Sequence, residues 1–156
     1  MKNFIRRLFG RFHVVTHSDV LSYKGSWRKG AFHGYGVLEY SNGGLYKGNF
    51  RSGVKHGFGV YTSASGFRYE GEWSYSEQTG SAKISYKNGD WYEGAVKNGV
   101  RCGLGELSEL SSQRIFKGNW QNGSLVGDIH ITSSDWKYFG TIPDPHGCAS
   151  GSLTYS

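Results

Sequence analysis

A five-residue motif recurs along this 156-residue chain at an almost constant interval. Its first copy reads Tyr23-Lys-Gly-Ser-Trp27, and a Gly-x-Gly and an Asn-Gly pair follow it. The copies are separated by three intervals of 23 residues and one of 24, since they begin at Tyr23, Tyr46, Tyr69, Tyr92 and Phe116. A fixed period of this length indicates a repeat architecture, in which each repeat is one small supersecondary unit.

Each period predicts a β-hairpin. Residues two apart share one face of a strand, so Tyr23 and Trp27 face one way while Lys24 and Arg28 face the other. Two-residue turn signals follow the motif at Lys29-Gly30, Ser52-Gly53, Asn98-Gly99 and Asn122-Gly123. The predicted fold class is therefore all-β: an elongated, twisted antiparallel sheet of consecutive β-hairpin repeats, with a short N-terminal amphipathic helix.

The glycines recur beside the motif aromatics. The chain has 25 glycines, about twice the usual share, and glycine normally weakens a strand. We therefore expect each glycine to leave a hollow in which a ring from the neighbouring strand lies flat. The rings predict a packing lattice or, if the sheet stays open, a groove for a partner segment. They are Tyr23, Trp27, Tyr46, Phe50, Tyr69, Trp73, Tyr92 and Trp120.

These motifs and their period resemble the MORN repeat (membrane occupation and recognition nexus). The resemblance covers residues 23–156 as an array of five to six hairpin repeats, the last of them degenerate, and 13–22 reads as a partial repeat strand. Later units depart from the pattern, since Ala82 and Ile129 replace the second glycine of Gly-x-Gly. The resemblance implies scaffolding, oligomerisation and contact with phospholipid.

Residues 1–12 predict a basic amphipathic helix, because their apolar residues recur at helical spacing and no acid precedes Asp19. Three interpretations stay open: a helix on an anionic membrane surface, a cap on the end of the repeat array, or an organelle targeting peptide. The membrane-facing apolar set is Phe4, Ile5, Leu8, Phe9 and Phe12, and the basic set is Lys2, Arg6, Arg7 and Arg11.

The positive charge is concentrated in the N-terminal part of the chain. Residues 1–58 carry ten basic residues against two acidic ones, whereas 59–156 carry eight against ten. An anionic partner is therefore expected at the basic end. The strand residues of the predicted anionic-surface site are Lys24, Arg28, Lys47 and Arg51, which repeat two columns of one face.

Metal and catalytic sites are not expected. Cys102 and Cys148 share a repeat column with His33 and His56, but column mates in adjacent repeats are separated by about 9 to 10 Å, too far for one zinc ion. Two cysteines make no disulfide framework, so free thiols in a reducing compartment are the expectation. No nucleophile–base motif is visible, and there is neither a long apolar run nor a secretion signal.

The predicted function is a non-enzymatic repeat scaffold without a cofactor, cytoplasmic and peripheral at a membrane. It binds a protein partner, and its basic N-terminal end contacts anionic phospholipid. One alternative is a sequestering or regulatory binder of a small anionic ligand, nucleic acid or an enzyme. The other alternative is an enzyme. Whether the chain forms a homodimer stays open. Nucleic acid is disfavoured, because alternation puts the bases and the aromatics on opposite faces.

Overall fold

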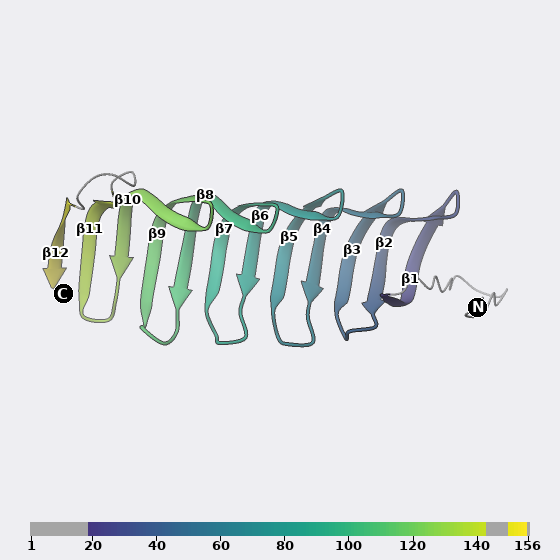
Figure 1. Ribbon diagram of the computed structural model, residues 1–156, viewed down its shortest axis with the longest axis horizontal. Coiled ribbons are helices and arrows are strands. Elements are labelled where there is room, and N and C mark those ends of the chain that lie inside the picture. Colours follow the sequence, from purple (N-terminus) through teal and green to yellow (C-terminus); the bar gives the residue numbers. More distant parts are fainter. Residues whose placement is uncertain (1–18, 143–149, 156) are drawn as a thin grey trace. The chain divides into compact units, whose positions relative to one another are not determined.

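The computed structural model describes residues 19–142 and 150–155 (Figure 1). All regular secondary structure in these residues is β-strand. The predicted helix at 1–12 and most of the partial repeat at 13–22 lie outside the described residues. The chain divides into two compact units, Met1–Glu77 and Gln78–Ser156.

The first unit contains five strands, and each pairs antiparallel with the next along the chain. Figure 1 shows these strands side by side and alternating in direction. Each hairpin takes one motif strand and one return strand, as the period predicts. The strands are β1 (Val20–Arg28), β2 (Ala31–Tyr40), β3 (Leu45–Arg51), β4 (Val54–Thr62) and β5 (Arg68–Ser74).

The second unit follows the same rule from β6, which begins at the unit boundary. The predicted fold class, consecutive antiparallel β-hairpins, is thereby confirmed. The strands are β6 (Glu77–Ser85), β7 (Trp91–Lys97), β8 (Val100–Glu109), β9 (Arg114–Gln121), β10 (Ser124–Thr132), β11 (Trp136–Ile142) and β12 (Ser150–Tyr155).

The hairpin turns have the backbone that the turn signals predict. At Asn98-Gly99 both central residues have positive φ, 51° and 74°, which matches the twist of the flanking strands. The third hairpin has the same backbone without a glycine, since Tyr75 and Ser76 have φ of 50° and 70°. Nothing in the sequence marks that turn.

The first glycine of each Gly-x-Gly has a role that the sequence interpretation missed. Gly34 has φ of 65°, and the pairing of β1 with β2 jumps from Gly25↔Gly36 to Trp27↔Phe32. Three residues of β2 therefore lie opposite one residue of β1, which is a β-bulge. Glycine is favoured there because it adopts positive φ without strain.

The remaining motif glycines make room for tyrosine rings, in part as predicted. A Cβ on Gly25 would lie 2.6 Å from the Tyr23 hydroxyl oxygen, and one on Gly36 would lie 2.5 Å from it. The ring thus covers a glycine of its own strand together with that glycine's partner on the next strand. The expectation of a ring from the neighbouring strand is right for Gly36, and it is wrong for Gly25, because the Tyr23 ring leans forward along its own strand.

The tyrosine hydroxyl fixes this position. Tyr23 Oη donates to the carbonyl oxygen of Ser26 at 2.9 Å. The corresponding hydroxyls of Tyr46, Tyr69 and Tyr92 donate to the carbonyl three residues ahead at 2.8 to 3.0 Å. Each buried hydroxyl therefore has an acceptor, which removes the cost of burying it unpaired.

The motif aromatics form the core of each unit through edge-to-face contacts. The Tyr46 ring centroid lies 5.1 Å from that of Phe50 on its own strand and 5.2 Å from that of Trp73 in the next repeat. Trp73 Nε1 also donates to the Gly59 carbonyl oxygen at 3.1 Å. Each aromatic pair contributes about 0.5 to 1.5 kcal/mol beyond its buried area, so the repeats are joined largely by rings.

Candidate binding surfaces

Four basic side chains lie exposed on the face of the first unit opposite the motif aromatics. Lys24 and Lys47 are joined in register through Val37, two strands apart, which corresponds to about 10 Å. Arg28 and Arg51 lie four residues further along the same strands, beside the hairpin turns. We call these four residues the basic face.

Two exposed aromatic rings share this side of the first unit. Tyr35 is 61% exposed and Phe58 is 53% exposed. Tyr35 pairs with Asn49 on β3, and the Asn49 side-chain amide donates to the Phe58 carbonyl oxygen at 3.2 Å. The expectation that aromatics and bases lie on opposite faces is right for the motif aromatics and wrong for these two rings.

Three of the four charges of the basic face are available to a partner. Arg28, Lys47 and Arg51 form no ion pair with any residue that the structure describes. The acids nearby have other contacts, since Glu39 accepts a hydrogen bond from Ser22 Oγ at 2.7 Å and Glu70 pairs with Arg68.

The predicted aromatic positions are packed against one another and leave little ring surface exposed. Seven of the eight are at most 5% exposed, and Trp27 is half-buried. One column of the return strands β2, β4, β6 and β8 has its carbonyl oxygen bound by the next hairpin turn, and its occupants in β2, β4 and β8 contact the rings. We call the residues of this column the covering residues. They are Phe32, Lys55, Gln78 and Arg101.

The covering residues are held alike although they differ chemically. The carbonyl oxygen of each accepts a hydrogen bond from the next hairpin turn; Phe32 receives it from Gly53 N at 2.9 Å and Lys55 from Ser76 N at 2.9 Å. The Phe32 ring stacks on Tyr23 with centroids 3.8 Å apart. The repeat therefore fixes the backbone at this position and leaves the side chain free to vary.

Lys55 places its ammonium among four aromatic rings. Nζ lies 4.4 Å from the ring centroid of Trp73, 5.3 Å from Tyr46, 5.6 Å from Tyr40 and 5.7 Å from Tyr61. Burial lowers the pKa of Lys55 to about 8, because the charged form loses solvation. Burial also raises the pKa of Tyr40 to about 12, with a smaller contribution from Tyr61.

Arg101 covers the rings of the second unit in a similar way. Its guanidinium carbon lies 4.3 Å from the Trp120 ring centroid and 5.7 Å from that of Tyr92, and Nη2 donates to the Gly123 carbonyl oxygen at 2.9 Å. Burial raises the pKa of Tyr92 to about 12. Arg101 thus has a hydrogen-bond acceptor where Lys55 has rings only.

Neither Lys55 nor Arg101 was among the predicted site residues, yet the sequence contained a signal for both. Two-residue alternation puts Lys55 on the same face as Gly57 and Gly59, which border the aromatic lattice. A cation at such a position points to a contact with aromatic rings.

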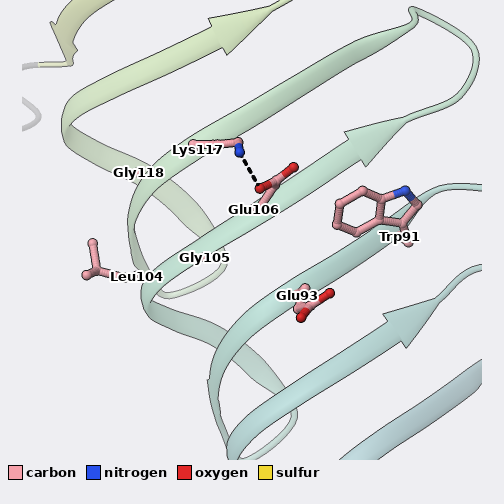
Figure 2. Close-up of a pocket in the computed structure, with 7 residues that line it drawn as sticks. All are labelled: Trp91, Glu93, Leu104, Gly105, Glu106, Lys117 and Gly118. Carbon is pink, nitrogen blue, oxygen red and sulfur yellow. Dashed lines mark ion pairs between the residues drawn. The ribbon is translucent and has the colours of Figure 1, made fainter.

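A shallow pocket of about 510 Å³ lies on the second unit (Figure 2). Trp91 and Glu93 of β7 and Leu104 and Glu106 of β8 line it, and Leu104 is 78% exposed. Glu93 and Glu106 are directly paired across the strands. Each also has a lysine partner: Lys83 Nζ lies 3.5 Å from Glu93, and Lys117 Nζ lies 2.7 Å from Glu106, the ion pair drawn in Figure 2.

Other predicted features fall partly outside the described residues. The basic and apolar sets of residues 1–12 lie there, as does Cys148, while Cys102 is a free thiol. Within 19–142 and 150–155, no three His, Cys, Asp or Glu side chains gather as metal ligands would. The same residues contain no helix long and apolar enough to span a bilayer.

Comparison with known families gives one match. The family model described as MORN repeat matches residues 23–45, 46–68, 69–91 and 92–108, more than half of the chain. The four matched segments begin at the motif tyrosines. No curated protein matches the chain.

Proposed function

The chain belongs to the MORN repeat family, and from this premise we propose that it is a non-enzymatic scaffold with two binding surfaces. MORN repeats serve as repeat scaffolds that commonly bind proteins or lipids, and they are generally non-enzymatic. In this proposal the basic face contacts an anionic membrane surface, together with the N-terminal segment 1–12. A surface of the second unit holds a protein partner.

The observation that carries the membrane part is the composition of the basic face. Exposed bases about 10 Å apart in register lie beside two exposed rings, Tyr35 and Phe58. Each basic side chain near an anionic leaflet contributes about 1 kcal/mol, and rings at the interface add apolar contact. Four strand bases therefore support weak, reversible and salt-dependent binding.

The pocket of the second unit supports the protein part. Leu104 and Trp91 offer apolar surface beside the carboxylates of Glu93 and Glu106. An apolar contact with a charged border is typical of a protein-binding surface. A partner segment with a basic residue next to an apolar one fits this chemistry.

Co-sedimentation with vesicles tests the membrane part. The first variant changes the basic face, Lys24, Arg28, Lys47 and Arg51, to glutamine, and a second lacks residues 1–12. A matched control changes four exposed bases of the second unit, Lys87, Lys97, Arg114 and Lys137, to glutamine. Vesicles of phosphatidylserine and phosphatidylcholine are compared with phosphatidylcholine alone.

The expected result is binding to the anionic vesicles, reduced at least tenfold in the basic-face variant and less than threefold in the control. An equal loss of vesicle binding in the basic-face variant and in the control would mean that only net charge matters, and the proposed surface would be wrong. Salt-dependent binding to a single-stranded oligonucleotide, with no binding to vesicles, would favour the nucleic-acid alternative.

A further inference from the structure

Lys55 is enclosed in a way that the scaffold function does not use. The ring centroids of Tyr46 and Trp73, which are 0% and 5% exposed, and those of the half-buried Tyr40 and Tyr61 all lie within 5.7 Å of the ammonium. We call these four rings the lysine cage. Lys55 itself is only partly buried, so part of its side chain is accessible to solvent.

The lysine cage supplies no counter-charge. None of the ion pairs or side-chain hydrogen bonds among the described residues involves Lys55 Nζ. The cation–π contacts of the rings offset only part of the lost hydration, since each contributes about 0.5 to 2 kcal/mol. Loss of solvation without a carboxylate is the arrangement that makes a lysine nucleophilic in proteins.

The backbone of Lys55 is fixed from both sides. Its carbonyl oxygen accepts a hydrogen bond from Ser76 N at 2.9 Å, and its own N–H donates to Ser76 Oγ at 3.2 Å. The side chain must therefore extend over the rings from a set position. Arg101, the covering residue with a similar ring contact, donates to a carbonyl and stays charged, so it lacks this reactivity.

We propose that Lys55 is a modification site, a nucleophilic lysine that accepts a small acyl group from an activated acyl donor such as a thioester. The neutral Nζ attacks the thioester carbonyl carbon, an N–C bond forms and the C–S bond breaks. The thiolate leaves with the electron pair, and the proton lost from nitrogen passes through solvent to the thiolate. The product is an uncharged amide.

The environment selects an acyl group over a carbonyl compound that forms an imine. A protonated imine would retain the positive charge that burial disfavours, whereas an amide removes it. The group must also be small, because the ring centroids of Tyr40 and Tyr61 lie 5.6 and 5.7 Å from the amine. The pKa of about 8 gives Lys55 roughly 200 times more neutral amine at pH 7.5 than a lysine at its ordinary pKa.

The test is site-resolved acetylation of the full chain by a small acetyl thioester at pH 7.5. Remaining amines are then acetylated with a deuterated reagent under denaturing conditions, and mass spectrometry gives the rate at each lysine. The exposed Lys83 and Lys97 are internal references. Lys55 is expected to react at least tenfold faster than either reference, and this ratio should fall to about one in 8 M urea.

A rate at Lys55 equal to or below the references in the folded chain would overturn the proposal. Tyr61→Ser opens the lysine cage and should lower the rate ratio at least threefold, whereas the matched change Tyr35→Ser on the basic face should leave it unchanged. The proposal is independent of membrane binding, so the basic-face glutamine variant should keep the rapid reaction of Lys55.

Discussion

At the scale of single residues, tyrosine and glycine act as one unit. Tyr23 lies over Gly25 and Gly36 and donates its hydroxyl proton to Ser26. Neither part works alone, because a methyl group on either glycine would overlap the ring. The motif spacing made this association predictable. The side from which the ring arrives was not predictable, because alternation fixes a face and not the direction in which a side chain leans.

The stability of the chain should depend on pH through Lys55. Its pKa is about 8 in the folded chain against 10.5 ordinarily, so the unfolded chain binds more protons between these values. The free energy of unfolding therefore rises as the pH is raised from about 8 towards 10.5, and it falls when the pH is lowered through the same range. Tyr40, whose pKa is raised to about 12, opposes this only above pH 10.

Lys55→Met should accordingly raise the free energy of unfolding at pH 7, and the difference from the parent chain should shrink by pH 9.5. Urea denaturation at the two pH values measures it, with the exposed Lys97→Met as control. If Lys55→Met is less stable than the parent chain by the same amount at pH 7 and at pH 9.5, the cation–π contacts outweigh the loss of solvation.

At the scale of elements, hairpin turns were predicted wherever glycine marked them, and the third was missed. Asn98 and Tyr75 occupy the same turn position with φ of 51° and 50°. Asparagine tolerates this conformation better than tyrosine does. The third turn therefore keeps backbone strain that the sequence does not reveal, because Ser76 N is held by the Lys55 carbonyl oxygen of the preceding repeat.

Exchanging the residue types should reveal that strain. Tyr75→Asn should stabilise the chain by about 0.5 to 1 kcal/mol, and Asn98→Tyr should destabilise it by a similar amount. Thermal unfolding of the two variants measures both effects. If Tyr75→Asn destabilises the chain, the contact of Tyr75 with His56, at 5.9 Å between ring centroids, is worth more than the strain.

At the scale of the whole molecule, stability should be local, because repeats contact mainly their sequence neighbours. Gly94→Ala would place a Cβ 2.5 Å from Gly105 Cα and 2.6 Å from the Tyr92 hydroxyl. Overpacking of this kind costs about 1 to 3 kcal/mol. Hydrogen exchange should therefore accelerate about tenfold or more in β7 and β8.

Strands β1 to β3 should keep their protection in the same Gly94→Ala experiment. The exposed Lys97→Ala on β7 is the control and should change neither region. Equal acceleration in every strand would mean that the chain unfolds as one cooperative unit, contrary to the expectation for a repeat protein.

The sequence predicted the fold well because period, turn chemistry and alternation are all local signals. It predicted the basic face for the same reason, since Lys24 and Lys47 follow from counting. It did not predict the lysine cage, because Tyr40, Tyr61 and Trp73 come from three different strands and converge only in the folded sheet. The exposed rings of Tyr35 and Phe58 were not predicted, because both residues stand between the two glycines of Gly-x-Gly and outside the five-residue motif.

The covering residues affect how the sequence of such a chain can evolve. The turn of the next repeat binds their backbone whatever the side chain, and phenylalanine, lysine, glutamine and arginine all occupy the position. A substitution there can alter the polarity, charge or reactivity of one repeat while its neighbours keep their geometry. Selection, or a designer, can therefore adjust the chemistry of this protein one hairpin at a time.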